Sequence, residues 1–234
     1  MKCSNNYFEE LVSIIIPAYN CENYIGITLD SVINQSYSNW EAIVIDDCST
    51  DDTFKVVNRY ENKDNRIKYH RLGINSGAAV ARNKAIELAR GKYIAFLDSD
   101  DTWEPKKLRN QIDFMELNDY YFTCTSYKKI DEDGKELSSV VKVSKKSDYN
   151  DLLKNCPGNS TVIYNATKLG KFFIEDIKKR NDYVMWLKVI KASKFIYGMD
   201  EVLSSHRIRK GSISQNKFSL INYHWKVYRE IDNS

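Results

Sequence analysis

The chain has 234 residues, 42% hydrophobic and 29% charged, which is long enough for one large globular α/β domain with a real core. Its 35 basic and 32 acidic residues give a net charge of only +3, which argues against a nucleic-acid partner. Five scattered cysteines without CxxC spacing favour a reducing, cytoplasmic setting, and no apolar run approaches the roughly 20 residues that span a bilayer.

The first half of the chain alternates between strand-like and helix-like segments. Short β-branched runs predict strands at 12–16, 40–45, 67–70 and 93–97. Each is followed by a predicted helix: one capped by Asn20, one opened by a capping box from Ser49 to Asp52, one at 76–90 and one at 105–117. Four strands each followed by a helix are typical of a parallel, doubly wound sheet, which binds ligands at the carboxyl ends of its strands.

The pattern changes after residue 117. Segments 120–130 and 137–143 flank the turn signal Asp133-Gly134 and predict an antiparallel hairpin. Further segments predict helices at 148–155 and 182–191, strands at 161–164, 195–199 and 202–208, and a last helix at 218–231. The sequence therefore predicts an α/β, Rossmann-like, mostly parallel sheet with a smaller antiparallel portion and a C-terminal amphipathic helix.

The apolar run at 93–97 ends in three carboxylates, Asp98, Asp100 and Asp101. Three acids within four residues repel one another beside a low-dielectric strand, so a cation is expected there. Oxygen ligands suit Mg²⁺ or Mn²⁺, which commonly bridge to substrate phosphates. The alternative is that these acids only open a turn and cap the next helix.

A second acidic pair, Asp46-Asp47, ends the strand predicted at 40–45. If both strand ends face one crevice, one acidic group can bind a base or ribose while the other holds a metal diphosphate. The turn Asn75-x-Gly77 precedes the helix predicted at 76–90, and a helix amino end is a natural neighbour for phosphate. For Asp46-Asp47 alone, a capping turn is the alternative.

Four motifs in order carry a resemblance to a known family: IIIPAYN at 14–20, VIDDxSTD at 44–51, NxGxxxARN at 75–83 and GxYIxFLDSDD at 91–101. Together with NDYVMWL at 181–187, they resemble the family 2 inverting glycosyltransferases of the GT-A fold. The resemblance covers roughly residues 11–214. It implies a single GT-A domain at 1–214, with a nucleotide-sugar-binding half at 11–117, an acceptor-binding half at 118–214, and a C-terminal helix at 215–234.

The resemblance also implies roles for individual residues. The donor, a UDP-hexose in this interpretation, is expected to contact Pro17, Ala18, Tyr19, Asn20, Asp46, Asp47, Asn75, Gly77, Arg82, Asp98 and Ser99. One aspartate of the pair at 46–47 would read the uracil or its ribose. Asp98 and Asp100 resemble the family's DxD metal site for Mg²⁺ or Mn²⁺, with Asp100 the more direct ligand. Asp182 corresponds to the catalytic base, and Trp186, one helical turn later, is expected to pack against sugar; helix capping is the alternative role of Asp182.

The chain departs from the family pattern near its end. Members often carry YRxHxxSxS, and the position of that histidine is Arg209 here, so histidine ligation of the metal is in doubt. Arg209 is instead expected to contact the diphosphate, because guanidinium pairs well with phosphate oxygens. His206 is interpreted as a structural residue.

The acceptor implied by the resemblance is a glycan or lipid-linked glycan of a bacterial surface polysaccharide or lipopolysaccharide. The C-terminal helix has two interpretations: packing onto the domain, or peripheral docking on the inner face of the cytoplasmic membrane.

Two other functions compete with glycosyl transfer. The segment FLDSDDT at 96–102 also fits the nucleophile motif of haloacid-dehalogenase-type phosphatases, in which Asp98 would be the nucleophile. A non-catalytic nucleotide-sugar-binding module is the third possibility. The presence of Asp182 argues against the module, and the position of the motif on the fourth predicted strand argues against the phosphatase.

Overall fold

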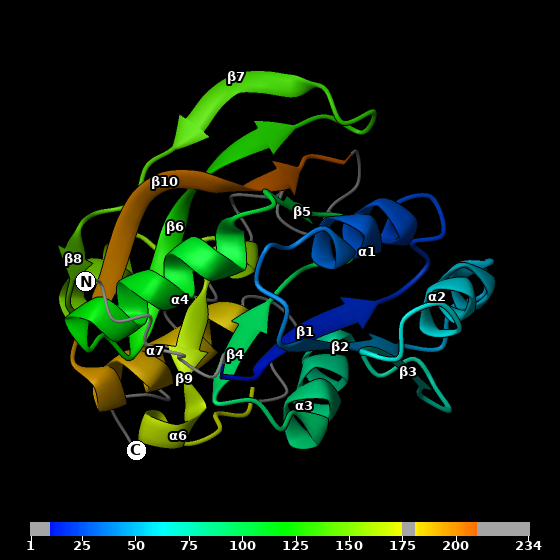
Figure 1. The fold of residues 1–234 in the computed structure, drawn as a ribbon, viewed down its shortest axis with the longest axis horizontal. Helices are drawn as coiled ribbons and strands as arrows, with labels where there is room; N and C mark the ends of the chain where they lie inside the picture. The colour runs from blue at the N-terminus through cyan, green and yellow to red at the C-terminus, as the bar shows by residue number, and fades with distance from the viewer. Residues whose placement is uncertain (1–9, 175–180, 210–234) are drawn as a thin grey trace, which may run out of the picture.

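A computed structural model describes residues 10–174 and 181–209 (Figure 1). The helix predicted at 218–231, the C-terminal region 215–234 and the end of the proposed domain at 214 lie outside the described residues. Among the residues that are described, no helix is both long and apolar enough to cross a bilayer.

The first half of the chain forms the parallel part of one ten-stranded sheet, in the order β3-β2-β1-β4. Its strands are β1 (Val12–Ala18), β2 (Trp40–Asp46), β3 (Ile67–Arg71) and β4 (Tyr93–Phe96). The helices that follow them are α1 (Ile25–Ile33), α2 (Thr53–Glu61), α3 (Ala78–Leu88) and α4 (Lys107–Asn118). The predicted alternation of parallel strands and helices is confirmed.

Two predicted helix caps are wrong. Helix α1 begins at Ile25, and Asn20 lies upstream with a positive φ of 45°. Its side-chain oxygen accepts a hydrogen bond from the backbone N–H of Thr50, so it joins two loops instead of capping a helix. Ser49 likewise donates its hydroxyl to Asp46 instead of capping α2. The partner of Asn20 lies on a neighbouring loop, and the partner of Ser49 lies at the end of the preceding strand.

The second half extends the same sheet with antiparallel and parallel strands. Strand β9 runs antiparallel to both β4 and β6, which puts β6 parallel to β4, and β10 pairs parallel with β6. The strands are β6 (Phe122–Ile130), β7 (Glu136–Val141), β8 (Lys146–Ser147), β9 (Ile163–Asn165) and β10 (Ile196–Arg207), with β5 (Thr102–Trp103) from the first half on the edge. The predicted hairpin of β6 and β7 is confirmed.

Strand β10 corrects the prediction of two separate strands at 195–199 and 202–208. It is one long strand whose pairing with β6 shifts register between Met199 and Ser204. Figure 1 shows it passing along the length of β6 and ending near β5 and α1. The irregularity lets a single strand carry Arg207 back to the segment that follows β4.

Helices cover both faces of the sheet. The remaining helices are α5 (Tyr149–Lys154), a 3₁₀ turn η1 (Asn159–Thr161), α6 (Ala166–Leu169) and α7 (Asn181–Ser193). One core cluster joins α1, α2 and α4 to the sheet, and the other joins α3, α5 and α7 to its opposite face. On β1, Ile14 belongs to the former cluster and Ile15 to the latter, as the period of two in a strand requires.

Trp186 of α7 lies in this second cluster. Its side chain is fully buried, and its ring packs edge-on against Phe96 at a centroid distance of 4.8 Å. The expectation that Trp186 packs against a sugar is therefore wrong. The ring instead anchors α7 to β4, which fixes the start of α7 relative to the acids that follow β4.

Candidate active site

The three acids that follow β4 have separate environments. The carboxylate of Asp98 accepts a hydrogen bond at 2.7 Å from Arg82 and another at 2.9 Å from the amide nitrogen of Asn159. Burial alone would raise the pKa of Asp98, but the Arg82 guanidinium holds it below its usual range. Asp98 is therefore a carboxylate that keeps its charge.

Asp100 forms an ion pair with Arg209, with Nε and Oδ2 2.7 Å apart. Burial and the negative charges of Asp101 and Asp98 nevertheless raise the pKa of Asp100 to about 6. The negative charge here is thus incompletely compensated by Arg209. A further cation beside Asp98 and Asp100 would relieve this repulsion.

Asp101 is fully buried, and its carboxylate holds neighbouring segments of the protein together. One oxygen accepts the backbone N–H of Arg207 at 2.9 Å, and the other lies 2.5 Å from the Ser160 hydroxyl and 3.2 Å from Nδ1 of His206. Burial alone would lower the pKa of His206, but Asp101, Asp98 and Asp100 raise it to about 9. The bond to Asp101 agrees with the structural role assigned to His206.

Arg82 joins the DxD segment to the predicted base. It lies on α3 with a side chain only 10% exposed, and burial alone would lower its pKa. The carboxylates of Asp98, Asp182 and Asp100 raise the pKa of this guanidinium instead. Asp182 is half-buried in the first turn of α7. Two predicted metal ligands and the predicted base therefore lie within electrostatic reach of one cation.

The acids that end β2 are held by loops of the same half of the chain. Asp46 is fully buried and accepts hydrogen bonds from the backbone and hydroxyl of Ser49 and from the Tyr69 hydroxyl. Asp47 accepts the backbone N–H groups of Ser76 and Gly77 at 2.6 and 2.7 Å. Its backbone oxygen accepts a hydrogen bond from the Asn75 amide. Asp47 therefore shapes the loop that leads into α3.

The remaining residues assigned to the donor lie at the carboxyl end of β1 and after β4. Pro17 and Ala18 are buried within β1, whereas the Tyr19 side chain is 49% exposed just beyond it. Ser99 accepts a hydrogen bond at its backbone oxygen from the Thr28 hydroxyl at 3.0 Å. Because β1 lies between β2 and β4, these residues and both acidic strand ends share one edge of the sheet.

The carboxylates of this site fit a hard divalent cation in part. Asp98 and Asp100 offer carboxylate oxygens, which Mg²⁺ and Mn²⁺ prefer, and the raised pKa of Asp100 reflects its burial together with the negative charges of Asp101 and Asp98. Within residues 10–174 and 181–209, however, no group of three or more His, Cys, Asp or Glu side chains is placed to hold a metal ion. The substrate phosphates and water would have to complete any coordination shell.

Several residues of this site could not be identified from the sequence. Asn159 and Ser160 lie about sixty positions after Asp98, yet the Ser160 hydroxyl accepts the backbone N–H of Asp98 as well as contacting Asp101. Thr28 of α1 donates its hydroxyl to the backbone oxygens of Ser99 and Asp101. These are ordinary polar residues without motif spacing, and only the folded chain brings them together.

Comparisons with known proteins agree with this architecture. Residues 13–175 match the model of Glycosyl transferase family 2. The chain is 42% identical over 226 residues to TuaG of Bacillus subtilis (strain 168), named as a teichuronic acid biosynthesis glycosyltransferase, covering 96% of this chain and 90% of TuaG. It is 40% identical over 210 residues to the Escherichia coli UDP-Glc:alpha-D-GlcNAc-diphosphoundecaprenol beta-1,3-glucosyltransferase WfaP, covering 89% of this chain and 82% of WfaP.

A solved structure of similar fold is that of Staphylococcus aureus TarS residues 1–349 in complex with UDP-GlcNAc. It has a TM-score of 0.72 and 25% sequence identity, and the match covers 87% of this chain and 60% of that chain. The predicted GT-A fold is thereby confirmed. With a family model matching residues 13–175 and relatives along nearly the whole length of the chain, this protein belongs to the family 2 glycosyltransferases.

Proposed function

We propose that the protein transfers a hexose from a UDP-sugar to a hydroxyl of a lipid-linked glycan, with inversion at the anomeric carbon and with a divalent cation. One observation carries this proposal: Arg82 lies within electrostatic reach of Asp98, Asp100 and Asp182. The residues assigned to the leaving group and to proton transfer thus act on one cation, which supports placing both at one site. WfaP, named for a UDP-Glc donor and a diphosphoundecaprenol-linked acceptor, supports the substrate classes.

The leaving group is the first chemical requirement. Breaking the bond between the sugar and the diphosphate builds negative charge on the phosphate oxygens, and a divalent cation held by Asp98 and Asp100 would stabilise that charge as a Lewis acid. Arg209, which pairs with Asp100, carries a guanidinium that can donate to the same oxygens. Arg82 balances the charge of Asp98, so the acidic segment keeps its position beside an anionic substrate.

Deprotonation of the acceptor is the second requirement. A hydroxyl is a weak nucleophile until a base takes its proton, and Asp182 is the carboxylate assigned to that step. Its place in the first turn of α7 leaves it half-buried and within electrostatic reach of Arg82. Attack by this hydroxyl opposite the departing diphosphate gives one inversion, through an oxocarbenium-like transition state.

For the nucleotide base, we assign recognition to Asp47. Asp46 has no exposed surface and already accepts three hydrogen bonds. Asp47 accepts two, and an ionised carboxylate has about four acceptor positions. Asp47 therefore retains acceptor capacity for a uracil N–H or a ribose hydroxyl, and its backbone N–H bonds Ala18 at the end of β1.

Because a lipid-linked acceptor is anchored in a membrane, we expect the protein to act at the inner face of the cytoplasmic membrane. This location, and the docking of residues 215–234 on that membrane, remain predictions. Sedimentation with anionic liposomes, comparing the full chain with a version that ends at Ser214, tests the docking. Equal partition of the two would contradict it.

A donor screen tests the proposed function. Purified protein is incubated with UDP-glucose, UDP-galactose and other nucleotide sugars, with Mn²⁺ or Mg²⁺ and with EDTA. We expect slow release of UDP from one hexose donor, stimulated by a GlcNAc-diphosphoryl lipid and abolished by EDTA. Binding of UDP-sugars without turnover would support the non-catalytic module instead, and phosphate release from simple esters would support the phosphatase. Family membership already argues against the phosphatase.

A further inference from the structure

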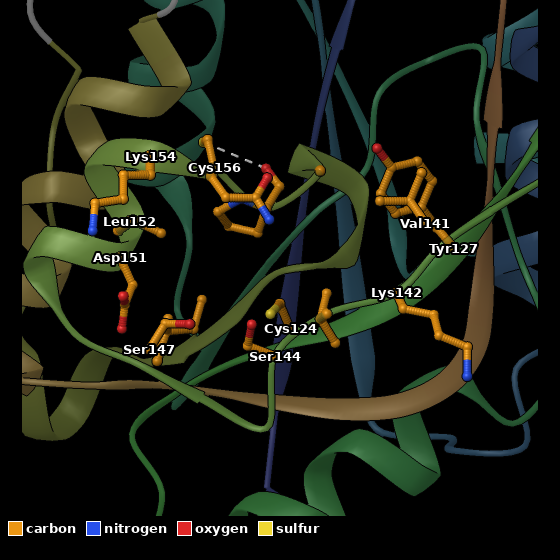
Figure 2. Close-up of a pocket in the computed structure, with 15 residues that line it drawn as sticks. Cys124, Tyr127, Val141, Lys142, Ser144, Ser147, Asp151, Leu152, Lys154 and Cys156 are labelled. Atoms are coloured by element: carbon orange, nitrogen blue, oxygen red, sulfur yellow. Dashed lines mark hydrogen bonds between the residues drawn. The ribbon is translucent and has the colours of Figure 1, made fainter.

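A pocket of about 310 Å³ lies in the second half of the chain, at the lower end of the roughly 300–1,000 Å³ typical of small-molecule sites. Figure 2 shows it between strand β6, the segment around 141–147 and helix α5. Every residue that lines it falls between Cys124 and Ile196. The donor-binding segments at the ends of β1 and β2 contribute nothing to its walls.

The lining combines apolar and polar groups. Cys124 and Leu152 form buried apolar surface, and Tyr127 adds an aromatic ring. Ser147, Lys142 and Lys154 contribute hydroxyl and ammonium groups. A pyranose has an apolar ring face and a rim of hydroxyls, so this mixture suits a saccharide better than a purely apolar ligand.

One wall of the pocket leads directly to the DxD segment. Tyr127 packs edge-on against His206 with ring centroids 5.9 Å apart, and His206 contacts Asp101. Burial raises the pKa of Tyr127, and the negative charge of Asp101 adds to the effect, in keeping with the packing of this ring against His206. Gly158 approaches this ring so closely that a Cβ there would lie 3.1 Å from it.

The same wall continues along the chain into the catalytic region. Cys156 and Gly158 line the pocket, and the next two residues, Asn159 and Ser160, bind Asp98 and Asp101. A ligand in the pocket would therefore contact the segment that positions the metal-binding acids.

Another wall is tied to the predicted base. Helix α5 supplies Leu152 and Lys154, and the backbone oxygen of Leu153 between them accepts a hydrogen bond from the Tyr183 hydroxyl at 3.2 Å. Tyr183 is the residue after Asp182. The walls of the pocket are thus connected both to the segment that binds Asp98 and Asp101 and to the residue that follows Asp182.

We propose that this pocket binds a saccharide unit of the acceptor. The inference rests on the proposed function, because it presumes that an acceptor glycan meets the donor at Asp98 and Asp182. The walls of the pocket come entirely from the second half, and they continue into the segment that binds Asp98 and into helix α5, which bonds the residue after Asp182. A saccharide held there would extend the acceptor toward these two groups.

Filling the pocket tests the inference. The Cys156→Phe change adds bulk from one wall and Ser144→Trp adds it from the other, where Ser144 is exposed and tolerant of substitution. We expect either variant to raise the KM for a soluble GlcNAc-diphosphoryl lipid at least about tenfold, with the KM for the sugar donor within twofold of the unmodified protein. The control is Asn150→Phe, an exposed position of α5 that does not line the pocket, which should change neither value. If both variants fold and neither changes the KM for the acceptor, the inference is overturned.

A chemical measurement avoids dependence on turnover. Cys156 is not disulfide-bonded and is half-buried on the pocket wall, so N-ethylmaleimide should label it, as peptide mass spectrometry reports. The GlcNAc-diphosphoryl lipid should slow labelling of Cys156 several-fold, whereas UDP should leave the rate unchanged. Equal rates with and without the lipid contradict the pocket assignment. Failure of every donor to turn over contradicts the proposed function instead, so the two outcomes are distinct.

Discussion

Two acidic strand ends lie on the same edge of the sheet, one after β2 and one after β4, and they differ in where their partners come from. Asp46 and Asp47 are held by residues 49–77, all within the first half. The acids after β4 are held mostly by residues of the second half, from Asn159 to Arg209. The first group completes a local loop scaffold, and the second exists only when both halves of the chain are assembled.

The difference teaches which acids are available for chemistry. Asp46 is fully buried, and three local hydrogen bonds occupy most of its acceptor positions, so we expect it to do little for a substrate. At the end of β4, burial and then the charges of Asp101 and Asp98 raise the pKa of Asp100 to about 6 in spite of Arg209. A site with uncompensated charge, assembled from distant segments, is where a cation and a diphosphate belong.

The largest expected effect is at Asp182, which the second half contributes to the β4 site. Asp182→Asn keeps the shape of the side chain but removes the base, so kcat should fall by about 10²–10⁴-fold while the KM for the donor changes little. Steady-state assay of UDP release in the presence of acceptor measures both. The control is Asp113→Asn, an exposed acid on α4, and a loss of less than tenfold at Asp182 would contradict its assignment as base.

Arg209 comes next. Arg209→Ala removes a guanidinium that pairs with Asp100 and that we expect to contact the diphosphate. A charge-assisted hydrogen bond contributes roughly 1.5–3 kcal/mol, so the KM for the donor should rise about tenfold or more. Arg59→Ala, an exposed change on α2, is the matched control. A donor KM within twofold of the unmodified value would remove Arg209 from the donor site.

Ser160→Ala compares the stability of the two strand ends directly. It removes one hydroxyl that bonds both the Asp98 backbone and the Asp101 carboxylate, which should lower the free energy of unfolding by about 1.5–3 kcal/mol. Ser76→Ala is the counterpart at the β2 end, where the backbone N–H and not the hydroxyl bonds Asp47. Its expected cost is below about 0.5 kcal/mol. Urea unfolding measures both, and equal costs would contradict the comparison.

The smallest effect is a pH dependence from His206. Its pKa is raised to about 9 by Asp101, Asp98 and Asp100, above the usual 6.5, so its stabilising charge is fully present below about pH 6.5. That stabilisation is lost as the pH rises through about 9. The free energy of unfolding should therefore fall more steeply between pH 7 and 9.5 in the unmodified chain than in His206→Gln. Identical slopes would show that the imidazole is not charged in the folded protein.

Much of the fold followed from local patterns. β-branched runs and helical spacing predicted β1 to β4 and their helices because each is stabilised by the same apolar faces that its sequence displays. The sequence does not reveal the two-residue strand β5 or the continuity of β10, because both depend on pairing between distant segments. The β5–β10 pairs are about 100 residues apart, and the β6–β10 pairs are about 75 apart. The predicted role of Trp186 is wrong because the sequence alone does not distinguish an aromatic ring that packs in a core from one that stacks on a sugar.

The site divides in the same way. Motif spacing singled out Asp98 and Asp100, and the family resemblance singled out Asp182. All three lie within electrostatic reach of Arg82, and their roles stay predictions. The sequence could not identify Asn159, Ser160 or the partner of His206 as parts of the site, because ordinary polar residues acquire such a role only through tertiary contact. Both DD at 46–47 and DSDD at 98–101 are acidic strand ends in the sequence, and only the structure shows that their surroundings differ.

The anomeric configuration of the product tests the central claim most directly. The protein is incubated with a UDP-α-hexose, Mn²⁺ and a GlcNAc-diphosphoryl lipid, and the new linkage is read from its proton NMR coupling constant. A single displacement with Asp182 as base predicts a β-linked product, absent with Asp182→Asn. An α-linked product, or a β-linked product formed equally well by Asp182→Asn, would contradict the account.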